Sequence, residues 1–172
     1  MSCSSRLGYD GEYLVDMAKR KQAIVAINGG GFVDINGESN GGNAAGVVIS
    51  EGKIIQGGYA SSGLIGFTND NKMYLGYISA TEAINKGIRD AVEFGPFLIV
   101  NGKKADIRGN GGYGIHPRAA IGQRQDGVVL FLVIDGRRTD SMGASIKDEM
   151  EIMAKYGAIN AANLDGGNSA VL

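Results

Sequence analysis

The sequence has very little cysteine, histidine, proline or tryptophan, and no strong charge of either sign. Its one cysteine, Cys3, cannot form a disulfide within the chain, so cysteine usage does not indicate a cellular compartment. The formal net charge of −1 gives no electrostatic reason to expect a nucleic acid or an anionic membrane as a partner. No apolar run approaches the roughly 20 residues that span a bilayer. The first residues are polar and do not form a signal peptide.

Several common catalytic patterns are also missing. The chain has no Gly-Lys-Ser/Thr phosphate loop and no G-x-G-x-x-G following a strand, which argues against the usual nucleotide-binding folds. It lacks the G-x-S-x-G turn of serine hydrolases and any cluster of His and Cys that would bind zinc. The chemistry must therefore come from other side chains.

Glycine is abundant, with 29 in 172 residues, against a typical share of roughly 7%. The glycines follow apolar runs without a period, which predicts many tight turns and glycine-lined surfaces. Hydrophobic content of 44% and charged content of 20% are those of a folded globular protein. The length suits one domain, and no linker divides the chain, so residues 1–172 are expected to form a single domain.

Hydrophobic periodicity predicts an α+β fold with a mostly antiparallel, partly mixed sheet and packed helices. Helices are predicted over residues 10–21, from the capping box Ser79–Glu82, and from Ser145 to Tyr156. Residues 107–115 are predicted to form a glycine-rich loop. Strands are predicted over 23–27, 46–50, 53–55, 64–68, 72–77, 93–100, 118–124, 128–134 and 158–164.

Two distant segments, 17–33 and 153–171, have similar sequences. Each begins Met-Ala-Lys and passes through a short Ala/Ile-rich run to a polar residue followed by Gly-Gly, so that Asn28 aligns with Asp165. This similarity predicts two helix–strand units that superpose and lie side by side in one sheet, with one shared site. The alternative is two ordinary helix–strand units that end in glycine turns.

Polar residues recur where predicted strands begin or end beside glycines. Each also has an ordinary structural role open to it: His116 as a structural or exposed histidine, Asp135 as a turn former, and Arg137 as a solvated cation. Taken together, carboxylates and arginines among glycines suit cleavage of a phosphorylated or glycosidic substrate. The candidates are Asn28, His116, Arg118, Asp135, Arg137, Asn163, Asp165 and Ser169.

Five motifs occur in an order that resembles the phosphodiester glycosidase family. They are Ile27-Asn-Gly-Gly-Gly-Phe32, Gly95-Pro-Phe-Leu98 with Asn101-Gly-Lys103, His116-Pro-Arg-Ala-Ala-Ile-Gly122, Val133-Ile-Asp-Gly-Arg137 and Asn163-Leu-Asp-Gly-Gly167. The resemblance covers almost the whole chain. It implies hydrolysis of a sugar-1-phosphodiester, such as an N-acetylglucosamine-1-phosphodiester, to the free sugar and a phosphomonoester. It also implies an extracellular or cell-envelope location and a phosphorylated glycan or sugar phosphodiester as partner.

The resemblance suggests roles for the candidate residues. Asp165 and Asp135 would be the catalytic carboxylates, one acting at the anomeric carbon and the other positioning water or a sugar hydroxyl. His116 would donate a proton or a hydrogen bond to the phosphate, which Arg118 and Arg137 would bind. The rest of the expected substrate-binding set is Asn28, Gly29, Gly30, Asn163, Gly166, Gly167 and Ser169.

The chain departs from the family pattern at Ala119, Asn168 and Ala170, and the resemblance suggests a domain that is truncated at both ends. These departures favour a rival hypothesis, a non-catalytic module of an envelope or phage surface protein that binds carbohydrate or phosphate. No cofactor is required by the sequence. A carboxylate such as Asp165 could hold calcium or magnesium, although no ligand spacing points to either metal.

Overall fold

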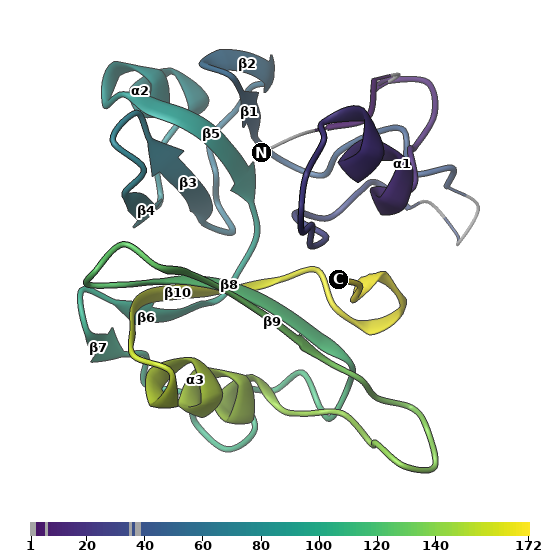
Figure 1. Cartoon of the computed structure of the whole chain (residues 1–172), viewed down its shortest axis with the longest axis vertical. Coiled ribbons are helices and arrows are strands. Elements are labelled where there is room, and N and C mark those ends of the chain that lie inside the picture. Colours follow the sequence, from purple (N-terminus) through teal and green to yellow (C-terminus); the bar gives the residue numbers. More distant parts are fainter. Residues whose placement is uncertain (1–2, 6, 35, 37–38) are drawn as a thin grey trace.

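The protein forms two stacked five-stranded sheets with a helix on the outer face of each (Figure 1). The structure is a computed structural model that describes residues 3–5, 7–34, 36 and 39–172. The first sheet has the strand order β2-β1-β5-β3-β4, and the second has the order β7-β6-β10-β8-β9. All strand pairings among the described residues are antiparallel, so the expectation of a partly mixed sheet was wrong.

The bounds of the elements agree with many of the ranges predicted from the sequence. The first sheet consists of β1 (Val48–Ser50), β2 (Lys53–Gln56), β3 (Leu64–Thr68), β4 (Met73–Gly76) and β5 (Ile88–Glu93). The second consists of β6 (Phe97–Val100), β7 (Lys103–Lys104), β8 (Arg118–Arg124), β9 (Val129–Ile134) and β10 (Ala158–Leu164). The helices are α1 (Leu14–Arg20), α2 (Ala80–Asn85), α3 (Ile146–Lys155) and the 3₁₀ turn η1 (Gly167–Ser169). No helix in the described part of the chain is long and apolar enough to cross a membrane.

Three apolar clusters hold the layers together. One lies between α2 and the first sheet, and a second lies between α3 and the second sheet. The third joins the facing sides of the two sheets, and it includes Ile65 from β3 and Ala119 from β8. Neighbouring residues on one strand, such as Leu64 and Ile65, belong to different clusters because successive strand side chains point to opposite faces.

The two sheets repeat one chain path. The first half runs through the hairpins β1–β2 and β3–β4, then α2 and the central strand β5. The second half runs through β6–β7 and β8–β9, then α3 and the central strand β10. Each helix starts with a capping box, as the sequence predicted, with Ser79 as N-cap in one half and Ser145 in the other. The molecule is therefore a structural duplication of residues 48–93 and 97–164.

Hydrogen bonds support this duplication at the level of single residues. At the tips of β1–β2 and β6–β7, Gly52 N donates to Arg89 O and Gly102 N donates to Ile159 O. At the start of each half, Glu93 N donates to Val47 O and Asn163 N donates to Pro96 O. Glu93 and Asn163 therefore hold equivalent places at the ends of the two central strands.

Three predictions about the sequence pattern were wrong. Residues 23–27 do not form a strand, because the segment pairs with no sheet; Ile24 is fully exposed, and Ile27 is partly buried against the cluster between the two sheets. The predicted repeat of terminal helix–strand units fails with it, since only its second copy contains a strand. The predicted strand over 93–100 is interrupted, because the chain leaves the first sheet after Glu93 and enters the second at Phe97.

Glycine 122 in the middle of β8 allows α3 and β10 to pack closely. A Cβ atom there would lie 2.6 Å from Met153 Cε and 2.8 Å from the carbonyl oxygen of Asn160. Because the carbonyl belongs to a paired strand and cannot move cheaply, Gly122→Ala should lower the free energy of unfolding by about 1–3 kcal/mol. Chemical denaturation would measure this change. Gly57→Ala is the control, because its Cβ would meet only Ile54 Cγ2 at 3.6 Å, and an equal loss there would contradict the packing argument.

Candidate active site

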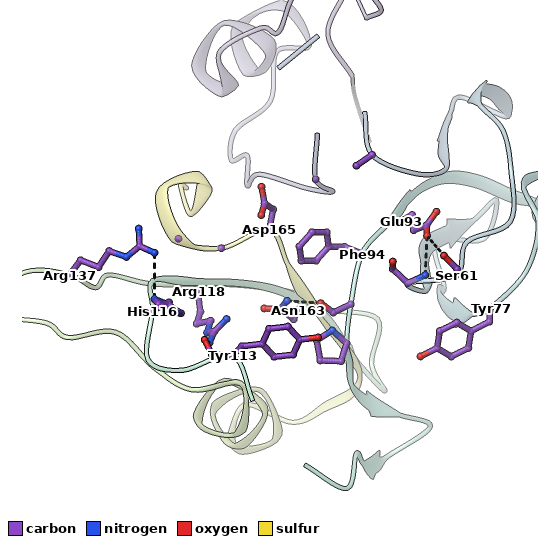
Figure 2. A pocket seen from close by; sticks show the side chains of 17 residues that line it. Ser61, Tyr77, Glu93, Phe94, Tyr113, His116, Arg118, Arg137, Asn163 and Asp165 are labelled. Atoms are coloured by element: carbon purple, nitrogen blue, oxygen red, sulfur yellow. Dashed lines mark hydrogen bonds between the residues drawn. The ribbon is translucent and has the colours of Figure 1, made fainter. Parts of the chain in front are cut away.

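A cavity of about 650 Å³ opens where the two halves meet (Figure 2). The ends of β5 and β10 and the start of β8 form its walls, together with loops that follow β9 and precede β8. Its lining residues are Gly31, Ala45, Ser61, Ser62, Tyr77, Glu93, Phe94, Gly95, Pro96, Tyr113, His116, Arg118, Arg137, Asn163, Asp165, Gly166 and Gly167.

Two arginines and the single histidine of the chain give one end of the cavity a positive character. Arg118 is only 6% exposed, and its guanidinium is held by backbone carbonyls: Nε donates to Ala144 O at 3.0 Å and Nη2 donates to Gly114 O at 2.9 Å. These bonds hold a permanently charged guanidinium at the cavity wall, because arginine is not deprotonated in proteins. An anion is the ligand that such a group favours.

Arg137 and His116 lie beside each other in Figure 2. Arg137 Nη1 donates to Asn168 Oδ1 at 2.8 Å, and Nη2 lies 3.4 Å from His116 Nδ1. Since a guanidinium can only donate, Nδ1 is the acceptor, and the proton of the neutral ring lies on Nε2. His116 can then offer an N–H group to a bound oxygen.

Asp165 supplies a carboxylate just after the end of β10. Burial raises the pKa of Asp165, and this rise is opposed by hydrogen bonds from the Ser169 side chain and the Gly166 backbone. Asn28 Nδ2 donates to the carbonyl oxygen of Asp165 at 2.6 Å, and Asp165 N donates to Gly29 O at 3.1 Å. The segment before the first sheet therefore fixes the backbone of Asp165 from both sides.

The first half contributes groups that the sequence analysis did not single out. Glu93 Oε1 accepts from Ser62 N at 2.9 Å and Oε2 accepts from Val47 N at 3.0 Å, so this carboxylate joins the segments that lead into β3 and β1. Phe94 and Tyr77 present aromatic rings near Glu93, on the side of the cavity away from Arg137 (Figure 2). The sequence did not point to Glu93, because the strand that it ends was not predicted.

Comparison with known proteins fits this geometry. A model of the family described as phosphodiester glycosidase matches residues 21–172. The chain belongs to the phosphodiester glycosidase family. This result confirms the resemblance seen in the five motifs.

Relatives of this phosphodiester glycosidase domain come from bacteria and animals. The SPbeta prophage-derived uncharacterized protein YomE of Bacillus subtilis is 33% identical over 92% of this chain, which covers 25% of that protein. N-acetylglucosamine-1-phosphodiester α-N-acetylglucosaminidase of Bos taurus is 27% identical over 90% of this chain, which covers 32% of that protein. The chain thus spans about a quarter to a third of these relatives.

Solved structures show the same fold. The zebrafish N-acetylglucosamine-1-phosphodiester α-N-acetylglucosaminidase catalytic domain, auto-inhibited by its pro-peptide, superposes with a TM-score of 0.73 at 24% identity, covering 92% of this chain and 56% of that one. A hypothetical protein from Synechocystis superposes with a TM-score of 0.71 at 18% identity, covering 91% of this chain and 48% of that one.

The structure brings about half of the predicted site residues of this phosphodiester glycosidase domain into one cavity. Those in its wall are His116, Arg118, Arg137, Asn163, Asp165, Gly166 and Gly167. Asn28, Gly29 and Ser169 lie behind the wall and contact Asp165 instead. Gly30 also lies outside the lining, where a Cβ would come 2.9 Å from the carbonyl oxygen of Glu93.

Asp135, the second predicted carboxylate, is exposed and does not line the cavity. It follows β9, which is the edge strand of the second sheet. β8 lies between β9 and β10, so Asp135 does not follow a direct neighbour of the strand that leads to Asp165. Its carbonyl oxygen accepts a hydrogen bond from Ser141 Oγ at 2.6 Å, as expected for a turn residue. Arg137, two residues later, does reach the cavity.

The sequence analysis left open whether a carboxylate such as Asp165 binds calcium or magnesium. Among the residues that the structure describes, no three or more His, Cys, Asp or Glu side chains come together as a metal site would require. Around Asp165, the groups that interact with the carboxylate are donors, Ser169 and Gly166. The positive charges that line the cavity are those of two side chains, Arg118 and Arg137.

Proposed function

We propose that this domain hydrolyses a sugar-1-phosphodiester to the free sugar and a phosphomonoester. The observation that carries the proposal is one cavity in which a carboxylate, Asp165, lies across from a cluster of Arg118, Arg137 and His116 (Figure 2). Membership of the phosphodiester glycosidase family and the names of the curated relatives support the same reaction.

The proposed reaction breaks the bond between the anomeric carbon and the phosphate oxygen. The electron pair of that bond stays on the phosphate, the oxygen of water bonds to the anomeric carbon, and the proton that the water gives up passes to the phosphomonoester or to solvent. Arg118 and Arg137 would bind the phosphate in both substrate and product, and His116 Nε2–H would add a hydrogen bond. Because a phosphomonoester is a good leaving group, this site needs a strong general acid less than ordinary glycoside hydrolysis does.

Asp165 is assigned the role of the carboxylate that acts at the anomeric carbon. A carboxylate there stabilises the positive charge that develops on the sugar ring, or attacks the carbon directly. The end of the cavity with Phe94, Tyr77 and Ser61 is assigned to the sugar, since aromatic faces and hydroxyl groups suit a sugar ring.

The direct test incubates the protein with an N-acetylglucosamine-1-phosphodiester and measures release of free sugar and phosphomonoester. Stoichiometric release of both products supports the proposal. A protein that binds the compound without turnover would support the rival hypothesis of a binding module. A protein that releases the free alcohol and leaves the phosphate on the sugar would place the cleaved bond elsewhere and contradict the proposed chemistry.

A further inference from the structure

Arg118 carries a buried charge whose hydrogen-bond partners are all neutral. The acceptors are the backbone carbonyls of Ala144, Gly114 and Tyr113, and none of them is a carboxylate. A guanidinium that is 6% exposed loses most of its hydration, so a nearby counter-charge stabilises it.

Glu149 on α3 is the carboxyl group placed to supply that charge. It is fully buried, and neither of its carboxyl oxygens has a hydrogen-bond partner within the described structure. α3 packs against β8, which begins at Arg118. Burial raises the pKa of Glu149 to about 8, and the positive charge of Arg118 opposes this rise.

The first half of the molecule shows that the fold does not need either residue. Ala120 pairs with Asn163, and Leu64 pairs with Glu93 at the equivalent place in the first sheet. Counting back two residues on each strand shows that Arg118 corresponds to Ser62. Glu149 directly follows Asp148, the last residue of the capping box of α3. The residue that directly follows the capping box of α2 is Ala83, which is also fully buried. The half that presents the positive end of the cavity has both charges, and the other half has neither.

Other ionisable groups near α3 do not account for this arrangement. β6 and β10, which pack on α3, carry no ionisable side chain. Arg124 of β8 pairs with Asp126, and Asp148 of α3 is engaged in the capping box with Ser145. Residues 105–117 add Asp106, Arg108, Tyr113 and His116, but the charge that acts on Glu149 is that of Arg118.

We propose that Glu149 is a positioning residue of the anion site: at alkaline pH its carboxylate is the counter-charge of Arg118 until an anion binds there, and it takes up a proton when the anion binds. The proposal rests on the anion site of the proposed function. A bound anion offsets the positive charge of Arg118, so the buried carboxylate loses the interaction that kept it ionised, and it accepts a proton from solvent. By reciprocity, the anion binds more weakly once Glu149 is ionised.

The test is calorimetric titration of sulfate into the protein at about pH 8, in two buffers of different ionisation enthalpy. Sulfate is chosen because its charge stays constant where Glu149 titrates. The wild type should take up a measurable fraction of one proton per sulfate, and its dissociation constant should rise roughly three- to tenfold from about pH 7 to about 9.5. Glu149→Gln keeps the shape and should show neither effect. Absent uptake in the wild type, or unchanged uptake in Glu149→Gln, would overturn the proposal.

Two further variants test which residue takes up the proton and which binds the anion. His116→Gln should keep the proton uptake at about pH 8, because Glu149 is the proposed proton acceptor; loss of uptake in this variant would assign the proton to His116 and overturn the proposal. The double variant Arg118→Ser/Glu149→Ala copies the first half of the molecule, so it should fold and bind sulfate roughly ten- to a hundredfold more weakly than the wild type. Folding with unchanged sulfate affinity would exclude Arg118 from the anion site.

The role of Glu149 and the proposed enzymatic activity can fail separately. Proton-coupled sulfate binding without turnover of a sugar-1-phosphodiester would leave the role of Glu149 standing and remove the enzymatic activity. Turnover without proton uptake at Glu149 would support the enzymatic activity and remove the proposed role of Glu149.

Discussion

Asp165→Asn is expected to lower the turnover number on a sugar-1-phosphodiester by about 10³- to 10⁵-fold, while the substrate still binds. Asparagine keeps the size of the side chain and its hydrogen bonds but removes the negative charge. If that charge acts on the developing positive charge at the anomeric carbon, it matters in the transition state far more than in the ground state. Such a loss corresponds to about 4–7 kcal/mol of transition-state stabilisation.

Asp135→Asn is the matched control for this variant. Both residues follow a strand of the second sheet and precede a glycine, and the sequence alone made both of them candidates. Only Asp165 lines the cavity, so Asp135→Asn should retain turnover within about twofold, as for most exposed substitutions. Steady-state kinetics of the two variants decides the assignment. Near wild-type turnover in Asp165→Asn, or a large loss in Asp135→Asn, would contradict it.

Stability should change in the opposite direction from activity at Asp165. Its pKa is raised in the folded state, mainly by burial. The stability that the protonated carboxyl contributes is therefore fully present below its unfolded pKa and is lost as the pH rises through the folded value. At neutral pH the ionised carboxylate works against folding, so Asp165→Asn should melt at the same temperature as the wild type or higher. A misfolded variant cannot then explain the loss of turnover.

Local features of the fold were predictable from the sequence, because neighbouring residues determine them. The Glu51-Gly52 and Asn101-Gly102 turns both adopt positive φ angles, as their residue types predict, and both capping boxes form. The strand β5 was missed because two charged residues, Arg89 and Asp90, interrupt its apolar pattern. Asp90 is nevertheless buried, where it accepts a hydrogen bond from Glu51 N at 3.0 Å.

Tertiary relations were harder to predict from the sequence. An apolar run such as 23–27 has the pattern of a buried strand, but burial depends on whether a sheet edge is available to cover it. The duplication is almost invisible in the sequence because hydrogen bonds to the backbone, and not side-chain identity, preserve it. The half of the site near Asp165 was found because its residues follow strands that the sequence predicted. The half near Glu93 and Ser61 became apparent only when the two halves faced each other across the cavity.

The second large effect is expected at Arg118. Because its contact with the phosphate exists in the substrate complex and in the transition state alike, Arg118→Ala should raise KM more than it lowers kcat. Loss of one charge-assisted contact costs about 1.5–3 kcal/mol, which corresponds to roughly a ten- to a hundredfold increase in KM. Arg118→Lys should recover only part of this loss, because an ammonium group cannot bind a phosphate through two parallel hydrogen bonds as a guanidinium does.

The control for Arg118 is Arg138→Ala. Arg138 is exposed and pairs with Asp140 at 3.0 Å on the surface, away from the cavity lining, so its removal should leave KM within about twofold. Arg118 also holds the carbonyls of Ala144 and Gly114, so part of its effect could come from displaced backbone. Added phosphate separates the two: it should raise the melting temperature of the wild type and Arg138→Ala, but not of Arg118→Ala. If KM of Arg118→Ala stays within about twofold of wild type, the phosphate is bound elsewhere, and Arg137 with His116 becomes the anion site.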